Sequence, residues 1–439
     1  MSEEKKSKLT RADLFSMSIG QIIGVGIMTM TGIAIGFTGR SVSFAYLVAG
    51  IITIVSAIPQ IYIGGTANFK GGQYSQIAVL GNRKLAGIYI FIQIAMSLGL
   101  AMYTLSFCDY FLSLFPAANV KVISFILLSV LFGMHVLGVK QAARLQNVLC
   151  IVLAAAVAAY IVFGIGNIQP GYFDAPGFLS GGPVGFILAS VYLTFAAGGA
   201  TYVVNYSSES ENPTKDIPFV IIVSTAAVVL VYAVMAAIAS GSIPVEQAAN
   251  QPLSVSAVTF MPKSLFTFFV VGGAMFALLT TLNFSIGMVV FPVMKACQDG
   301  WLPKGLAAAN KKYGTAHKIL LMFYLVALLP ILLGININTI ANSTVILTTA
   351  IRGVICFVAL ALPKKLPELW KKSAFYVPDR KLKAISVIGI FLALLSVVLL
   401  LVTTAPAQIM GNCCILCAAV VLAFIRDGKV DLQAGYTEK

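Results

Sequence analysis

Residues 12–37, ADLFSMSIGQIIGVGIMTMTGIAIGF, decide the fold: the stretch is apolar and long, yet Gly20, Gly24, Gly26 and Gly32 surround its middle. A helix rises about 1.5 Å per residue, so about 20 apolar residues cross a bilayer core of ~30 Å. Unpaired backbone groups cost several kcal/mol in hydrocarbon, so a helix breaks there only where protein, water or a ligand covers the gap. We therefore expect a membrane helix broken near 23–27.

The whole chain has the composition of a membrane protein. Of its 439 residues, 59% are apolar and 10% are charged, whereas soluble domains carry about 25% charged residues. Uninterrupted apolar runs favour helices over the ~10-residue alternating strands of a barrel. We predict an all-α polytopic membrane protein with twelve transmembrane helices, at approximately 12–37, 42–66, 85–115, 120–139, 145–166, 183–206, 218–241, 265–296, 317–335, 337–362, 384–403 and 406–426.

Positive charge predicts the orientation of these spans. The net charge is +14. If both termini lie on the same side of the membrane, 25 of the 29 basic residues fall in the segments on that side. Positive residues favour the cytoplasmic side and anionic lipid. We predict a multi-pass protein of the cell (plasma or inner) membrane with both termini in the cytoplasm, and we expect no nucleic-acid partner.

A second break is expected in the sixth span, where Ala196, Ala197, Gly198, Gly199 and Ala200 follow one another. The two breaks occupy matching places in two five-helix halves, 12–166 and 183–362. Each half has an odd number of crossings, so the halves run in opposite directions. A terminal pair at 384–426 and polar tails at 1–11 and 427–439 complete the predicted organisation.

Paired broken helices in inverted halves point to a transporter's central site. Free N–H groups of the half-helix that begins near Gly26 suit a carboxylate, and unwound carbonyls around 196–199 suit an ammonium group. A zwitterionic amino acid presents both. Tyr103 of the third span is a further pocket candidate. We expect Arg352 in an interior cavity or paired with a carboxylate such as Glu209.

Other chemistry has little support in the sequence. The seven cysteines lie in or beside apolar runs, and Cys414 and Cys417 lack the second pair or histidine that a metal site needs. Walker, H-E-x-x-H and G-x-S-x-G motifs are missing from the sequence. We therefore expect neither an enzyme nor a bound cofactor or metal.

Several motifs resemble, in order, those of the amino acid–polyamine–organocation (APC) family of secondary transporters. The similar stretches are IGVGI at 23–27, GGQY at 71–74, GVK at 138–140 with QN at 146–147, ESENP at 209–213 with IP at 217–218, and DGWLP at 299–303. The resemblance implies the leucine-transporter (LeuT) fold: a five-plus-five inverted repeat followed by two peripheral helices.

The resemblance also implies roles for individual residues. Phe195 falls where the family places an aromatic gate over the substrate, and Thr201 falls where some amine- and arginine-recognising members carry Glu. That missing carboxylate favours a neutral amino acid. The expected substrate-binding set is Ile23, Gly24, Val25, Gly26, Ile27, Tyr103, Phe195, Ala196, Ala197, Gly198, Gly199 and Thr201.

The sequence is compatible with both symport and antiport. Leu153 stands where some members carry a proton-linked Lys, so that proton route is not expected. A possible sodium site, similar to that of sodium-coupled members, comprises carbonyls of Gly20 and Ile23 with Ala277, Thr280 and Thr281. Alternatively, threonine hydroxyls bond carbonyls of their own helix, and the carrier exchanges substrates without an ion or uses protons by another route.

Three hypotheses about function therefore remain. We prefer alternating-access transport of neutral zwitterionic amino acids by Na⁺ or H⁺ symport or by exchange. The first alternative is an exchanger of cationic amino acids or polyamines. The second is a non-transporting amino-acid sensor or a channel. Either a monomer or a homodimer is compatible with the sequence.

Overall fold

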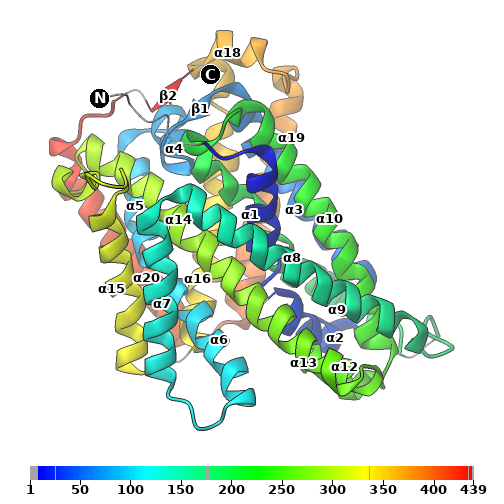
Figure 1. Cartoon of the computed structure of the whole chain (residues 1–439). Helices are drawn as coiled ribbons and strands as arrows, with labels where there is room; N and C mark the ends of the chain where they lie inside the picture. The colour runs from blue at the N-terminus through cyan, green and yellow to red at the C-terminus, as the bar shows by residue number, and fades with distance from the viewer. Residues whose placement is uncertain (1–7, 25, 175–176, 336, 434, 438–439) are drawn as a thin grey trace.

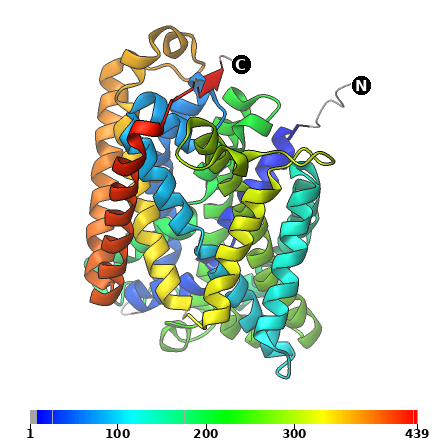
Figure 2. The ribbon, with the colours of Figure 1, turned by 90° about the vertical axis from the view of Figure 1, so that its left-hand side faces the viewer.

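The computed structural model describes residues 8–24, 26–174, 177–335, 337–433 and 435–437. The chain is a bundle of long helices (Figures 1 and 2). Helices in its first half are α1 Arg11–Ile22, α2 Thr31–Thr38, α3 Val42–Thr66, α4 Gln73–Leu80, α5 Arg83–Met96, α6 Gly99–Leu114, α7 Val120–Leu137, α8 Val139–Gly164, α9 Gly182–Ala197 and α10 Pro213–Gly241. Later helices are α11 Val245–Ala248, α12 Ser254–Phe260, α13 Lys263–Phe268, α14 Phe276–Asp299, α15 His317–Leu333, α16 Ile337–Ala359, α17 Leu362–Lys365, α18 Pro367–Lys372, α19 Asp379–Thr403 and α20 Pro406–Arg426.

Shorter elements connect or interrupt these helices. The π-helical segments are η1 Gly26–Met30 and η5 Phe269–Met275. The 3₁₀ segments are η2 Gly39–Ser41, η3 Ile165–Asn167, η4 Ala200–Glu209, η6 Lys304–Ala307 and η7 Asp427–Lys429. Strands β1 (Asn68–Phe69) and β2 (Tyr436–Thr437) pair antiparallel, with Asn68 opposite Thr437.

The prediction of a helical polytopic membrane protein is confirmed. In the described residues, nine helices are long and apolar enough to cross a membrane: Thr31–Thr66, Arg83–Leu112, Val120–Leu137, Val139–Asn167, Gly182–Glu209, Pro213–Gly241, Lys263–Asp299, Asp379–Val402 and Pro406–Lys429. The expected span 12–37 is divided at the first glycine cluster. The expected spans 317–335 and 337–362 correspond to shorter apolar helices, His317–Leu333 and Thr344–Ala359.

The two broken helices cross in opposite directions. The helix α1 packs on η4, while η1 and α2 pack on α9. The beginning of one broken helix therefore lies beside the end of the other. This arrangement brings the two interruptions together inside the bundle, where surrounding helices cover them.

Both termini lie at one end of the bundle, which we call the terminal face (Figure 1). The β1–β2 pair and α18 lie at the same end. Three segments counted with the inner positive charge, namely 67–84, 364–383 and the chain after residue 425, include elements that gather there. The opposite end, which we call the far face, carries α2, α12 and the start of α9.

Helices α19 and α20 lie at an edge of the bundle (Figure 2). The helix α19 packs on α16 and α3, whereas α20 packs mainly on α5. Both expose large apolar side chains, including Phe391, Val402 and Ile425. Such a surface suits hydrocarbon, which agrees with the peripheral position expected for the last two helices.

Candidate functional site: a cavity between two broken helices

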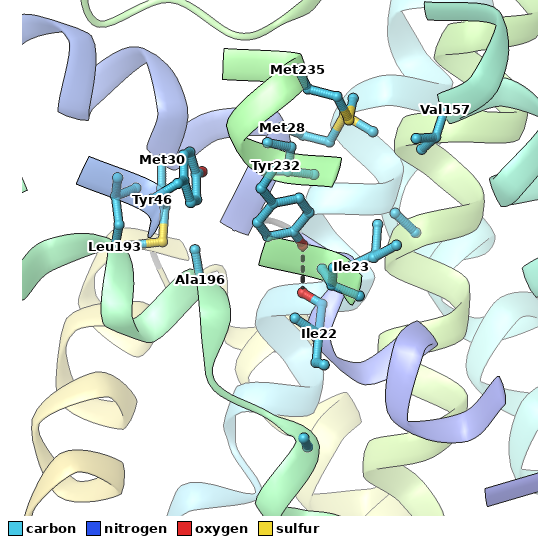
Figure 3. Packing of buried hydrophobic residues seen from close by; sticks show 14 of the residues in the cluster. Ile22, Ile23, Met28, Met30, Tyr46, Val157, Leu193, Ala196, Tyr232 and Met235 are labelled. Atoms are coloured by element: carbon cyan, nitrogen blue, oxygen red, sulfur yellow. Dashed lines mark hydrogen bonds between the residues drawn. The ribbon is translucent and has the colours of Figure 1, made fainter. Parts of the chain in front are cut away.

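The first break leaves the carbonyl end of α1 inside the protein. The helix ends at Ile22, and helical structure resumes at Gly26. Tyr232 of α10 reaches into the gap, and its hydroxyl donates to the Ile22 carbonyl at 2.9 Å (Figure 3). Because an unpaired carbonyl is costly in a dry interior, this tyrosine stabilises the broken conformation.

The second break is made by a glycine pair. The helix α9 ends at Ala197, Gly198 is extended, and Gly199 has a φ of 133°. Only glycine adopts that backbone region without strain. A Cβ on Gly199 would also lie 3.3 Å from the Gln21 carbonyl oxygen. The sequence-based location of this break, at 196–200, agrees with the observed structure.

A cavity of about 440 Å³ opens between the two breaks. Seven of the predicted substrate-binding residues line it: Gly24, Gly26, Tyr103, Phe195, Ala196, Gly198 and Gly199. Four others lie outside the described lining: Ile23, Ile27, Ala197 and Thr201. Ile27 and Ala197 are fully buried in the packing around the breaks. Val25 lies outside the described residues.

The side-chain positions of α9 explain part of this division. Phe195 and Ala196 reach the cavity while Ala197 turns into the core, as expected when successive residues of a helix point about 100° apart. Phe195 is half-buried at the cavity wall, a position compatible with the gate role that the resemblance implies.

Sequence reasoning missed several polar residues of the lining. They include Gln21 of α1, Gln93 of α5, Tyr202 of η4 and Ser285 of α14. A polar residue in an apolar run was the available signal, but it does not say which side of a helix faces the cavity. Tertiary packing decides that.

Arg352 of α16 also lines the cavity. Its guanidinium lies against the second break, since a Cβ on Gly198 would come within 2.7 Å of its Nη2. Glu209, the partner considered from sequence, makes no ion pair with it; among the described residues Arg352 has no salt bridge. The first expectation, an interior cavity, is the one that the geometry supports. Asp109 is exposed on α6, outside the described lining.

The residues of the possible sodium site meet at one point. The Thr281 hydroxyl oxygen lies 2.9 Å from the Gly20 carbonyl, 3.4 Å from the Ile23 carbonyl and 2.9 Å from the Ala277 carbonyl. Thr280 donates to the Ala277 carbonyl at 2.8 Å. One hydroxyl has a single proton to donate, so it cannot satisfy three carbonyls fully. Thr281 thus ties α14 to the end of α1, besides bonding its own helix.

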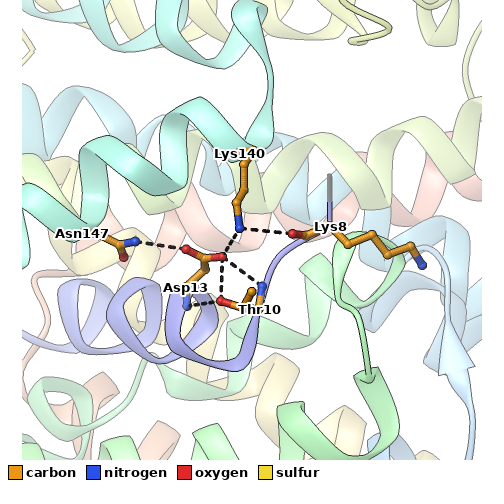
Figure 4. A network of polar contacts seen from close by, with 5 residues as sticks. All are labelled: Lys8, Thr10, Asp13, Lys140 and Asn147. Atoms are coloured by element: carbon orange, nitrogen blue, oxygen red, sulfur yellow. Dashed lines mark hydrogen bonds and ion pairs between the residues drawn. The ribbon is translucent and has the colours of Figure 1, made fainter. Parts of the chain in front are cut away.

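Ion pairs and hydrogen bonds hold the start of α1 at the terminal face. Asp13 of α1 pairs with Lys140 at the start of α8 and accepts a hydrogen bond from Asn147 at 3.0 Å (Figure 4). Arg11 pairs with Asp216 of α10 at 2.7 Å. Backbone bonds join Leu9 to Glu209 and Glu211. The start of the first broken helix is therefore fixed to three other segments.

The cavity lies toward the far face. Its lining includes Phe37 near the end of α2, Leu188 and Tyr192 in α9, and Thr404 just after α19. Within the described ranges, no group of three or more His, Cys, Asp or Glu side chains could hold a metal ion. The site therefore offers backbone dipoles, hydroxyls, amides and one guanidinium to a ligand.

Comparison with known proteins matches the chain to a protein family and to several transporters. The amino acid permease family model matches residues 9–424. The methylthioribose transporter of Bacillus subtilis (strain 168) is 26% identical over 86% of both chains. The branched-chain amino acid permease BcaP of the same strain is 24% identical over 83% of this chain and 82% of its own. The human cystine/glutamate transporter is 27% identical over 52% of this chain and 48% of its own. This chain therefore belongs to the amino acid permease family, within the APC transporters that its motifs resemble.

Proposed function

We propose that the protein is a secondary active transporter of amino acids that works by alternating access. The observation that carries the proposal is the contact between the two helix breaks beside a cavity: Gly26 and Ala196 touch, and both line it. Family membership supports amino acid transport as the activity.

The backbone of the substrate is recognised by main-chain dipoles in this proposal. The carboxylate is held at the helix that resumes at Gly26, where free N–H groups carry partial positive charge. The ammonium group lies near the carbonyl end of α9, which it shares with the Arg352 guanidinium that contacts Gly198. Tyr232 and Thr281 already hold carbonyls of α1, which leaves α9 as the better acceptor.

The proposed architecture is the twelve-helix LeuT-like fold, with repeats at 12–166 and 183–362 and two further helices at 384–426. The opposite directions of the two broken helices support it. The terminal face is proposed to be cytoplasmic because positive segments gather there. Contact with anionic lipid would follow at that face.

In alternating access, the terminal face would open while the far face closes. The cavity lies toward the far face while Asp13, Lys140, Arg11 and Asp216 close the terminal face. Rocking of the broken helices against their neighbours would separate these pairs and open the cavity on the terminal side. A carrier is never open at both faces at once, and this distinguishes it from a channel.

The cavity favours a neutral or anionic side chain over a cationic one. Its described lining contains no Asp or Glu and one Arg. A desolvated cation there would lack a counter-ion and face Arg352. This disfavours the cationic amino acid and polyamine alternative. Relatives named for branched-chain amino acids and for cystine and glutamate fall within the favoured classes.

Coupling is proposed to run through the contact of Thr281 with α1. In ion-free exchange, its hydroxyl keeps α1 joined to α14 in the loaded carrier. In sodium symport, the cation would be coordinated by the Thr281 hydroxyl oxygen and by the carbonyls of Gly20, Ile23 and Ala277, in place of the present hydrogen bonds.

A thermal-shift screen of the purified protein tests the proposal. Amino acids and amines are compared in sodium and in choline, because a ligand that binds the folded state raises its apparent stability. Stabilisation by a class of amino acids, followed by saturable uptake into liposomes, is expected. A sensor would show the thermal shift without uptake, and that outcome would refute transport.

A further inference from the structure

Arg352 is a charged residue of the cavity that the backbone-recognition scheme does not use. Within the part of the chain that the structure describes, it is the one charged side chain of the lining. No carboxylate in that part forms a salt bridge with it. A charge in a low-dielectric interior is normally paired, so the empty carrier holds an uncompensated positive charge where the substrate binds.

The guanidinium lies close to the place proposed for the substrate backbone. Gly26 of the first break contacts Ala196, and Arg352 contacts Gly198. Ala196 and Gly198 are two positions apart in the sequence, so at most about 7 Å of extended chain separates them. A molecule whose α-carboxylate sits at Gly26 therefore has Arg352 within reach of a short side chain.

The surroundings leave the guanidinium directed to the cavity. Its electrostatic neighbours are Tyr202 and Cys356, both neutral groups. Tyr202 bonds to Thr348, and the Cys356 thiol donates to the Ser56 carbonyl at 3.4 Å. Neither neighbour supplies the negative charge that would neutralise the arginine.

We propose that Arg352 selects an amino acid with an acidic side chain, so that the loaded cavity is electrically neutral. The planar guanidinium binds a carboxylate through two parallel hydrogen bonds. A zwitterion alone would leave the positive charge uncompensated. This inference rests on the proposed transport function, and it replaces the neutral side chain expected from sequence with an anionic one.

A structural role is the competing explanation for the same contact. The guanidinium lies near the carbonyl end of α9, where a cation stabilises a helix. In that case Arg352 would stabilise the break without contacting the substrate side chain, and its loss would weaken the binding of all substrates equally. Glutamate and glutamine separate the two roles because they differ in side-chain charge and hardly in shape.

The experiment measures binding of L-glutamate, L-aspartate, L-glutamine and L-leucine to the full chain by thermal shift and by competition. The wild type should bind glutamate or aspartate about 30-fold or more tightly than glutamine. Arg352→Gln should remove that preference while glutamine binding and ligand-free stability are retained. Arg352→Lys keeps the charge without the planar fork and should retain part of the preference.

Lys121→Gln is the matched control, because it removes one positive charge from an exposed site at the start of α7. It should leave the glutamate preference unchanged. Equal binding of glutamate and glutamine by the wild type, or equal loss of both in Arg352→Gln, would overturn the role of Arg352 and leave transport standing. Binding of no amino acid at all would instead overturn the transport proposal itself.

Discussion

Gly26 lies against Ala196 so closely that a Cβ added to Gly26 would come within 2.8 Å of the Ala196 Cβ. These residues belong to breaks that are far apart in the sequence, and their contact fixes how closely the two broken helices approach. Glycine is needed at residue 26 for this reason, quite apart from backbone freedom. The contact also sets the width of the proposed carboxylate site.

Gly26→Ala is expected to reduce substrate affinity at least tenfold, because the new methyl group forces the breaks apart and displaces the N–H groups that hold the carboxylate. Gly133→Ala in α7 is the control, since a Cβ there meets nothing within 4 Å. The combination Gly26→Ala with Ala196→Gly removes the methyl–methyl clash and should restore part of the affinity. Unchanged uptake by correctly inserted Gly26→Ala protein would refute the site assignment.

Tyr232→Phe should destabilise the protein by about 1–3 kcal/mol, because the buried Ile22 carbonyl loses its donor. The loss is measured as a lower unfolding midpoint in detergent at fixed lipid content. Tyr324→Phe in α15 removes a partly buried hydroxyl that bonds Ser129 and serves for comparison. A smaller effect at Tyr232 than at Tyr324 would contradict the capping role.

Thr281→Ala separates the two coupling schemes. If sodium binds where the hydroxyl meets α1, the variant should lose sodium-stimulated uptake while Thr281→Ser, which keeps the hydroxyl, retains it. In an ion-free exchanger, Thr281→Ala should lower stability by about 1–3 kcal/mol through the unpaired carbonyls, with uptake equal in sodium and in choline. The measurement is initial uptake in both salts.

Asp13→Asn should favour opening of the terminal face, because it removes the ion pair between α1 and α8. Cys150 reports this motion: its thiol donates to the Ser16 carbonyl at 3.2 Å in the same interface. Labelling of Cys150 by a thiol reagent, read by mass spectrometry of its peptide, should become faster. Arg83→Gln breaks a different terminal-face pair, with Asp427, and should not change that rate.

The sequence predicted the places of both breaks because glycine clusters inside apolar runs are local signals. The first was expected at 23–27, and helical structure stops at Ile22 and resumes at Gly26. Of the residues that the sequence predicted for the cavity, Tyr103, Phe195 and five of the six glycines and alanines of the two breaks line it, whereas Ala197 and Ile27 turn into the core. Periodicity within one helix cannot tell which face meets a cavity.

Long-range contacts were the features that sequence reasoning could not find. The bond from Tyr232 to Ile22 joins residues 210 positions apart, and the β1–β2 pair joins a loop to the end of the chain. The expected span at 85–115 is two helices, with a turn around Ser97. The sequence around that turn, 95–100, contains one glycine, Gly99, and no proline. It therefore lacks the local cluster that marks the two breaks.

Counterflow in proteoliposomes tests the central claim most directly, namely that an amino acid crosses the membrane at the two breaks by alternating access. Vesicles loaded with an unlabelled amino acid that stabilises the protein are diluted into a trace of the labelled form. The account predicts transient accumulation of label above its equilibrium level, lost or much reduced in Gly26→Ala. Label that only equilibrates, at a rate linear in concentration, would contradict it.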